Sequence, residues 1–281
     1  MLALSELDLV DARSAIRAAL AEDVGDADIT SSLVIPETLR FHGVMSARHA
    51  MVVSGLPVAH EVFRTVVPHA TFRVVAKEGQ PIAAGAVLAE MEGPARGLLT
   101  AERTALNFVQ FMTGIATLTH QYAETIRGTG CTLLDTRKTI PGLRRLSKYA
   151  TRCGGAQNHR MGLFDGVLIK DNHIAVCGSV SEAVRRAKFS ANRVPVEVEC
   201  DRLEQVREAV AAGADIILLD NMTLAQLREC VVFVNKRAKT EASGGVNLET
   251  IRAIAETGVD FVSVGRITQS APSADIGLDW K

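Results

Sequence analysis

From about residue 130 onward, short apolar runs alternate with segments in which apolar residues recur every three or four positions. The runs are rich in leucine and β-branched residues and lie at 131–136, 166–171, 194–200, 215–221, 239–245 and 260–266. The segments between the later runs have helical spacing, and they lie at 179–190, 202–213, 224–238 and 247–258. Near-continuous apolar strands that alternate with helices predict a parallel sheet buried on both faces.

Polar residues at the strand ends distinguish between two arrangements of such a sheet. The alternation fits both a closed αβ barrel and an open doubly wound sheet, but no G-x-G-x-x-G motif follows the first strand, which disfavours a dinucleotide-binding domain. Almost every run ends in charged or glycine-rich residues. In an αβ barrel the carboxyl ends of the strands surround one mouth, where sites are built. The pattern therefore favours the barrel.

The first 105 or so residues have a different pattern. An amphipathic helix is expected over 7–21, and alternating stretches at 42–55, 71–80 and 78–93 predict strands. These elements indicate a separate α+β domain over residues 1–108, and the tail 270–281 is a segment that can pack on it. A long helical region at 100–128, with a possible break at Gly114, leads into the barrel, which we assign to 109–269.

Composition excludes several classes of partner. The 281 residues include 31 Lys and Arg against 32 Asp and Glu, so no global field attracts nucleic acid or an anionic membrane. Aromatic residues make up 4% of the chain, too few for a base-stacking surface. The five cysteines are widely spaced, without a C-x-x-C pair, and the N-terminus lacks a signal pattern. We expect a cytoplasmic protein that binds neither nucleic acid nor membrane.

Four cations are expected at the barrel mouth. Arg137 and Lys138 end the first strand, Arg160 follows Asn158-His159, and Lys170 ends the second strand. Arginine binds carboxylates and phosphates through a bidentate fork, and lysine supplies a point charge. Converging cations of this kind predict a polyanionic substrate. The nearby Arg144 and Arg145 fit a solvated face better.

Acids occupy the later strands. Glu197 and Glu199 alternate in one strand and so share a face, and Asp220 closes the next strand. Acids opposite a cation cluster can hold Mg²⁺ or a ribose, or can stabilise a cationic transition state. For Glu197, an ion pair with a lysine in the barrel core is an equally good interpretation.

Two late loops are typical of phosphate sites. Ser243-Gly244-Gly245 precedes a helix, and Gly265 follows the next strand. Backbone amides in such loops bind phosphate, and the last two strand–helix loops of αβ barrels are a frequent phosphate site. His159 is a candidate substrate contact, whereas the role of His173 stays open between structure and catalysis. Together the residues predict a phosphosugar-binding αβ barrel.

Longer motifs resemble one family closely. They are DTRKTIPGLRR, NHRMGLFDGVLIKDNHI, VEVE, AGADIILLDNM, EASGGV and ETGVDFVSVG, together with EDVGDADITSS and GLLTAERTALNFVQFMTGIAT near the N-terminus. The chain thus resembles the quinolinate phosphoribosyltransferase family over nearly its whole length. The resemblance implies an N-terminal α/β sandwich domain and a C-terminal incomplete TIM-like barrel. It also implies Mg²⁺-dependent transfer of phosphoribosyl from phosphoribosyl pyrophosphate to quinolinate, with loss of CO₂, in NAD biosynthesis.

The resemblance also assigns roles to individual positions. It implies a quinolinate pocket made of Thr136, Arg137, His159, Arg160 and Lys170. Arg103 is implied to come from the partner subunit of a homodimer, or of a higher oligomer. Catalytic roles are implied for Lys138, between the two substrates, and for Glu199 and Asp220, at the ribose and the Mg²⁺. Phosphate binding is implied for Ser243, Gly244, Gly245 and Gly265.

Two segments depart from the family pattern, and three alternative functions remain open. The chain has Gly154-Gly155-Ala156-Gln157 where the family has a third glycine, and it has Arg266 and Gln269 after the last strand. One alternative is the molybdenum-transport-associated paralogue of the same fold. Another is an αβ-barrel lyase that uses Lys138 or Lys170 as a Schiff base, which requires a desolvated lysine. A non-catalytic scaffold is the third.

Overall fold

The computed structural model describes residues 6–190 and 194–281, and these form two compact units. The first unit contains the chain up to His120, then Thr139–Gly155 and Ile267–Lys281. The second contains Gln121–Lys138 and Ala156–Arg266. The expected boundary at residue 108 and this division after His120 both fall inside helix α4, Ala95–Thr125. None of the helices in the described ranges is long and apolar enough to cross a bilayer.

The first unit is built on an antiparallel sheet of four strands in the order β12-β1-β5-β3. Its strands are β1 Arg40–Ala47, β3 Thr71–Val74, β5 Val87–Pro94 and β12 Ile276–Trp280, with a separate β2 Met51–Val52 and β4 Pro81–Ile82 pair. Its helices are α1 Glu6–Val24, α2 Ile29–Val34, α3 Leu56–Val66, most of α4, and α5 Arg144–Cys153. The C-terminal tail belongs to this sheet, since β12 pairs with β1 from Gly43↔Trp280 to Ala47↔Ile276.

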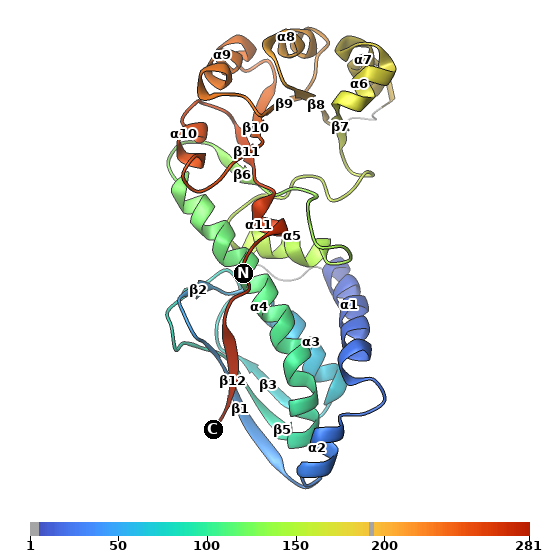
Figure 1. Ribbon diagram of the computed structural model, residues 1–281, viewed down its shortest axis with the longest axis vertical. Coiled ribbons are helices and arrows are strands. Elements are labelled where there is room, and N and C mark those ends of the chain that lie inside the picture. The colour runs from blue at the N-terminus through green and yellow to red at the C-terminus, as the bar shows by residue number, and fades with distance from the viewer. Residues whose placement is uncertain (1–5, 191–193) are drawn as a thin grey trace. The chain divides into compact units, whose positions relative to one another are not determined.

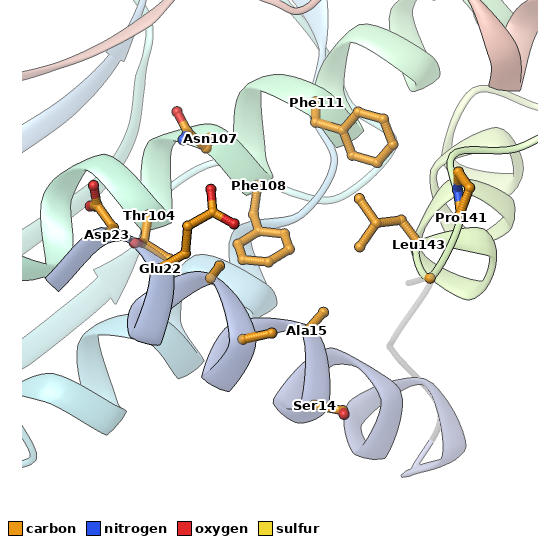
Figure 2. Close-up of a pocket in the computed structure, with 13 residues that line it drawn as sticks. Ser14, Ala15, Glu22, Asp23, Thr104, Asn107, Phe108, Phe111, Pro141 and Leu143 are labelled. Carbon is orange, nitrogen blue, oxygen red and sulfur yellow. Dashed lines mark hydrogen bonds between the residues drawn. The ribbon is translucent and has the colours of Figure 1, made fainter. Parts of the chain in front are cut away.

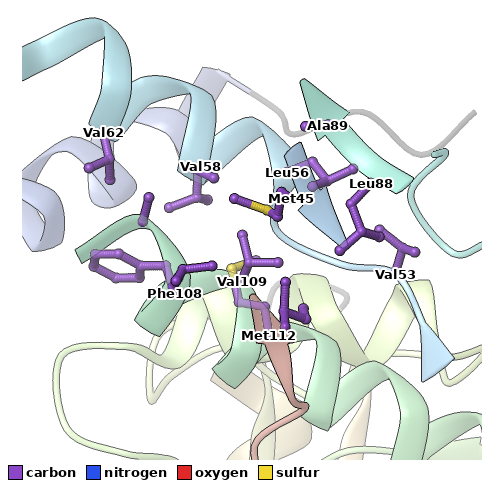
Figure 3. Packing of buried hydrophobic residues seen from close by; sticks show 14 of the residues in the cluster. Met45, Val53, Leu56, Val58, Val62, Leu88, Ala89, Phe108, Val109 and Met112 are labelled. Carbon is purple, nitrogen blue, oxygen red and sulfur yellow. The ribbon is translucent and has the colours of Figure 1, made fainter. Parts of the chain in front are cut away.

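One apolar core joins the sheet of the first unit to its helices. Figure 3 shows Met45 of β1 and Leu88 of β5 beside Leu56 and Val58 of α3 and Met112 of α4. The alternation of apolar residues in β1 and β5 presents one face of the sheet to these helices, which gives the sandwich that the resemblance implied. The fold-class prediction is confirmed for this unit.

Leu56 allows a test of this core. Its side chain is fully buried at the start of α3, so Leu56→Ala removes three carbon atoms and leaves a cavity. We expect the free energy of unfolding to fall by about 2–5 kcal/mol, measured by urea denaturation. Val232→Ala is the control, because Val232 is 78% exposed on the second unit, and we expect a change within about 0.5 kcal/mol. Equal effects of the two substitutions would contradict the proposed packing.

The second unit is a six-stranded parallel sheet in the order β6-β11-β10-β9-β8-β7. Its strands are β6 Thr132–Leu134, β7 Val167–Ile169, β8 Val196–Cys200, β9 Ile216–Asp220, β10 Lys239–Ser243 and β11 Phe261–Ser263. Its helices are α6 Asp171–Cys177, α7 Val180–Ser190, α8 Leu203–Ala211, α9 Leu224–Val234 and α10 Ile251–Ala255, and α11 Arg266–Gln269 follows at the boundary of the units. Figure 1 shows the sheet curved, with α6 to α10 around its outer side.

The curved sheet remains open at one seam. Within the described ranges no ladder joins β6 to β7, so the barrel is incomplete, as the resemblance implied. Val196, Val198 and Cys200 belong to the core between sheet and helices. The alternating Glu197 and Glu199 therefore lie on the opposite, interior side of the sheet.

The expected break at Gly114 is wrong, because α4 is continuous from Ala95 to Thr125. A side chain at Gly114 would meet the backbone, since its Cβ would lie 2.1 Å from the Pro272 carbonyl oxygen. The glycine thus allows the C-terminal tail to approach the helix closely, rather than interrupting the helix. Sequence spacing cannot distinguish these two uses of glycine, because the approaching segment is more than 150 residues away.

Candidate active site

A cavity of about 520 Å³ opens in the second unit at the carboxyl ends of the strands. Eleven of the thirteen predicted site residues line it: Thr136, Arg137, Lys138, His159, Arg160, Lys170, Glu199, Asp220, Ser243, Gly244 and Gly245. The remaining lining residues are Leu168, Leu218, Asn221, Glu241 and Ser263. Apart from His159 and Arg160, these residues lie on or directly after all six strands of the sheet, because parallel strands bring their carboxyl ends to one edge.

A buried aspartate fixes the two segments that carry most of the cations. Asp135 is fully buried directly after β6, and its carboxylate accepts hydrogen bonds from the Asn158 side chain at 2.6 Å and from the His159 backbone N–H at 2.9 Å. Backbone hydrogen bonds of Gln157 to Leu133 and Asp135 extend the same pairing. The side chain at position 157 does not make these bonds, so the departure at Gln157 leaves the segment in place.

Lys170 lies beside the predicted catalytic acid. Its ammonium forms an ion pair with Glu199, while its backbone N–H donates to His173 Nδ1 at 2.9 Å. His173 thus caps the first turn of α6, which is a structural contact. Lys170 is 46% exposed in its side chain, so it remains accessible to an anion in the cavity.

The interior of the barrel holds His159 between two buried acids. His159 Nε2 lies 3.0 Å from Glu197 Oε2 and 3.7 Å from Glu241 Oε2. The interpretation of Glu197 as the partner of a core lysine is therefore wrong, because its partner is a histidine. These three groups are also close enough together to bind a metal ion. Burial and the neighbouring Glu197 carboxylate raise the pKa of Glu241, because a buried site disfavours a second negative charge beside the first.

The raised pKa of Glu241 gives a prediction for stability. The folded state binds the proton on Glu241 more tightly than the unfolded chain does, so the stabilisation is complete below the usual carboxyl pKa and is lost as pH rises towards the folded pKa. Glu241→Gln keeps the shape without the charge. We expect the free energy of unfolding to exceed that of the unsubstituted protein by about 1–3 kcal/mol at pH 8, with little difference at pH 5. Urea unfolding at both pH values measures it.

The control for Glu241 is Glu204→Gln, an exposed acid on α8. We expect that substitution to leave the pH dependence of unfolding unchanged. A Glu241→Gln effect of equal size at pH 5 and pH 8 would contradict the assignment of the raised pKa to Glu241.

Arg137 and Arg160 line this cavity, and each has one buried donor without a hydrogen-bond acceptor among the described residues. The Nε atom of each is buried and has no hydrogen-bond partner among the described residues. Burial and the nearby Arg137 charge lower the pKa of Arg160. Two adjacent cations with unsatisfied donors are costly in an empty cavity, and a ligand with carboxylate oxygens would satisfy both.

The opposite wall joins acids to a glycine loop. Asn221 Nδ2 donates to Asp220 Oδ2 at 2.7 Å, and the Asn221 backbone N–H donates to the Ser243 carbonyl at 2.9 Å. Gly244 has φ +95°, and a Cβ there would lie 2.2 Å from Asn221 Oδ1. Only glycine fits this conformation and this contact together. The exposed backbone of Gly244 and Gly245 is suited to an anion such as phosphate.

Several predicted cations and glycines lie outside the cavity lining. Arg103 is an exposed residue of α4 in the first unit. Gly265 lies behind the cavity, where an added Cβ would come within 3.0 Å of Lys138 Cδ, so it gives room to the lysine. Arg144 donates to Thr139 Oγ1 at 3.1 Å and, like Arg145, begins α5 in the first unit. Arg266 is exposed at the start of α11.

A second cavity, of about 690 Å³, lies in the first unit. Figure 2 shows Phe108 and Phe111 of α4 on one side, with Glu22 and Asp23 of α1 nearby. Among the described residues, its lining contains two acids, no cation and no glycine-rich loop apart from Gly142. This cavity is therefore unsuited to a polyanion, whereas the cavity of the second unit has the cations, the phosphate loop and the acids.

Three residues that shape the site could not be identified as such from sequence patterns. Asp135 directly follows β6 and Glu241 lies in the middle of β10, and only the structure shows that both acids are buried. Asn221 follows Asp220, and its left-handed backbone is visible only in the structure. Chemically, the cations can bind a small dicarboxylate, and the glycine loop can bind a phosphorylated sugar beside it. The acids are suited to the region where the two ligands meet.

Comparisons with known proteins agree with this chemistry. Residues 28–113 match the N-terminal domain of quinolinate phosphoribosyl transferase, and residues 115–279 match its C-terminal domain. The chain is 44% identical to the nicotinate-nucleotide pyrophosphorylase [carboxylating] of Mycobacterium leprae, over 98% of this chain and 99% of that protein. It is 42% identical to a probable enzyme of the same name from Bacillus subtilis, over 92% and 89%.

Solved structures with the same name share the fold. The nicotinate-nucleotide pyrophosphorylase of Ehrlichia chaffeensis superposes with a TM-score of 0.93 at 38% identity and covers 100% of both chains. That of Francisella tularensis superposes with a TM-score of 0.91 at 39% identity, covering 98% of this chain and 97% of its own.

Proposed function

The chain belongs to the quinolinate phosphoribosyltransferase family, and we propose that it joins quinolinate to phosphoribosyl pyrophosphate. The products are nicotinate mononucleotide, pyrophosphate and CO₂, as in NAD biosynthesis. One observation carries the proposal above the others. The buried Nε atoms of Arg137 and Arg160 have no protein partner among the described residues, and they lie in the same cavity as the glycine loop. A dicarboxylate would accept hydrogen bonds from the arginines, and a sugar phosphate would accept them from the glycine loop.

Quinolinate binding is assigned to the cationic side of the cavity. The two carboxylates of quinolinate match two guanidinium forks, Arg137 and Arg160, with Lys170 as a third positive charge. His159, held by Glu197 at 3.0 Å, and Thr136 complete this side. Fixing both carboxylates orients the ring, so that its nitrogen points at C1 of the ribose and the reaction becomes effectively unimolecular.

Bond breaking is assigned to the opposite side. As the C1–oxygen bond to pyrophosphate breaks, positive charge develops on the ribosyl group and negative charge on the leaving group. Glu199 and Asp220 stabilise the ribosyl charge, while Lys138 stabilises the departing pyrophosphate. Ser243, Gly244 and Gly245 hold the 5′-phosphate through backbone N–H groups, and Gly265 leaves space for Lys138.

Decarboxylation requires little from the protein. Attack by the ring nitrogen makes it cationic. When the adjacent carboxylate leaves as CO₂, the C–C electron pair stays on that ring carbon, where the neighbouring cationic nitrogen stabilises it, and a proton from water then takes the place of the carboxylate. The remaining carboxylate stays bound to the cationic side until the mononucleotide leaves.

Magnesium is part of the proposal because the acids fit it. Glu199 and Asp220 lie near the ends of neighbouring strands, β8 and β9, and line one cavity. One or two carboxylates plus substrate phosphates are the usual way that proteins hold Mg²⁺. When bound, the ion supplies positive charge to the diphosphate.

The magnesium assignment predicts the effect of Glu199→Gln. The substitution keeps the shape of the side chain and removes one charge from the two-acid set. We expect the Mg²⁺ concentration for half-maximal activity to rise by about tenfold, a loss of about 1.4 kcal/mol. Glu204→Gln on α8 is the matched control. An unchanged Mg²⁺ requirement in the Glu199 variant would remove this acid from the metal site.

Assembly and location complete the proposal. Arg103 is exposed on α4 and is assigned to the quinolinate site of a partner subunit, which requires a homodimer or a higher oligomer. Mixing a subunit that carries Arg103→Ala with one that carries Lys138→Ala would restore activity if one site in the mixed dimer is intact. We also propose a cytoplasmic location.

One assay tests the reaction directly. Purified protein, Mg²⁺, phosphoribosyl pyrophosphate and carboxyl-labelled quinolinate should release labelled CO₂ together with pyrophosphate. Nicotinate, which lacks one carboxylate, should be a poor substrate because it satisfies only one arginine. Absence of labelled CO₂, or equal turnover of nicotinate, would overturn the proposal.

The contacts in this cavity also bear on the alternative functions that the sequence left open. A Schiff-base lyase needs a desolvated lysine, but Lys170 is 46% exposed and ion-paired to Glu199. Borohydride trapping with a keto acid should therefore leave the protein unmodified. A paralogue with another substrate, or a scaffold without activity, would fail the labelled-quinolinate assay.

A further inference from the structure

Asn221 stands between the acid side and the phosphate side of the cavity. It lines the cavity and directly follows Asp220 at the end of β9. Its side-chain N–H donates to Asp220 Oδ2 at 2.7 Å, and its backbone N–H donates to the Ser243 carbonyl of β10 at 2.9 Å. One residue therefore contacts the proposed metal acid and the proposed phosphate loop.

The backbone of Asn221 has an unusual conformation for a residue with a side chain. Its φ is +54°, and the other non-glycine residues with positive φ in the described ranges are Asn235 and Lys236. A left-handed conformation is unfavourable for most residues with a side chain and less so for asparagine. Helix capping does not account for it, because Thr223 caps α9 with its own hydroxyl and Gln226.

The loop that faces Asn221 is shaped around its amide. An added Cβ at Gly244 would lie 2.2 Å from Asn221 Oδ1 and 2.6 Å from its Cγ. The amide is thus packed against the loop backbone on one side and bonded to Asp220 on the other. The hydrogen bond occupies Oδ2 and fixes the plane of the carboxylate, which sets where the second oxygen lies.

From these contacts we propose that Asn221 is a positioning residue for phosphoribosyl pyrophosphate. It orients the Asp220 carboxylate and holds the Ser243–Gly245 loop at a fixed distance from it, so that the ribose and phosphate contacts form together. This inference rests on the proposed function. It assigns Asn221 to the sugar-phosphate side alone, since its contacts do not include the cations assigned to quinolinate.

Two substitutions separate the amide from the backbone. Asn221→Gly removes the amide and keeps the left-handed conformation, whereas Asn221→Ala removes the amide and strains the backbone. The matched control is Asn235→Gly, at the opposite end of α9, where Asn235 has φ +44° and caps the helix. Calorimetric titration with phosphoribosyl pyrophosphate and Mg²⁺, and separately with quinolinate, measures each affinity without turnover.

We expect Asn221→Gly to weaken phosphoribosyl pyrophosphate binding by about tenfold, which corresponds to about 1.4 kcal/mol. Quinolinate binding and the melting temperature should stay near those of the unsubstituted protein, and Asn235→Gly should change neither affinity. Normal phosphoribosyl pyrophosphate affinity in Asn221→Gly, with a loss only in Asn221→Ala, would reduce Asn221 to a backbone role and overturn the inference. Equal losses for both substrates would also overturn it.

Gly244→Ala gives an independent test from the other side of the contact. Its methyl group would push the Asn221 amide away from Asp220, so it should also weaken phosphoribosyl pyrophosphate binding selectively. In the Asn221→Gly background the added loss should be smaller, because coupled residues are not additive. Full additivity contradicts the inference. An unsubstituted protein that binds neither substrate would instead refute the proposed function.

Discussion

Lys138→Ala should lower kcat by about 10³-fold, the upper range for removing one preorganised group that stabilises charge in a transition state. Lys138 follows β6 and lines the same cavity as the two arginines and the glycine loop. Its backbone N–H donates to Thr136 Oγ1 at 3.0 Å, and Gly265 packs against its side chain. The lysine is therefore held where pyrophosphate is proposed to leave. The measurement is release of labelled CO₂ under saturating substrates.

The controls separate this role from a general loss of charge. Lys188→Ala removes a lysine that pairs with Asp215 on the helical side of the second unit, and we expect normal kcat. Lys138→Arg keeps the charge on a longer, planar group, and should recover part of the rate. Near-normal turnover in Lys138→Ala, with the melting temperature unchanged, would remove Lys138 from the mechanism.

The sequence predicted the parts of the site that lie directly at strand ends. Arg137, Lys138, Glu199 and Asp220 follow apolar runs, and parallel strands bring their ends together whatever the details of the sheet. The same reasoning failed for a side chain whose partner lies in a segment outside the strands. The sequence left Glu197 equally open to an ion pair with a core lysine, but its partner is His159, which lies in a segment outside the regular strands.

Positions that hold other residues in place were beyond the reach of the sequence patterns. Asp135 looks like any acid at a strand end, and its two bonds to the 158–159 segment depend on the pairing of Gln157 with β6. Gly114 looked like a helix break, although it makes space for the tail at Pro272. Both functions depend on contacts between distant segments, and hydrophobic periodicity carries no information on such contacts.

Arg160→Met should raise the KM for quinolinate by more than about 100-fold, since breaking a buried charge pair costs about 2–5 kcal/mol, while the KM for phosphoribosyl pyrophosphate stays the same. Arg160 is assigned to a quinolinate carboxylate, and its buried Nε has no acceptor in the described part of the protein. Methionine fills a similar volume without charge or donors. Arg160→Lys, which keeps the charge and loses the fork, should lie between the two.

The same substitution should stabilise the protein in the absence of substrate. Burial and the Arg137 charge lower the pKa of Arg160, which means that the folded state disfavours its charge at neutral pH. Removing that charge should raise the melting temperature of the ligand-free protein, although it removes quinolinate binding. A binding site for an anion places like charges close together, so it lowers stability in return for activity. A lower melting temperature together with unchanged KM for quinolinate would show that Arg160 supports the fold, and the dicarboxylate would then have to bind elsewhere.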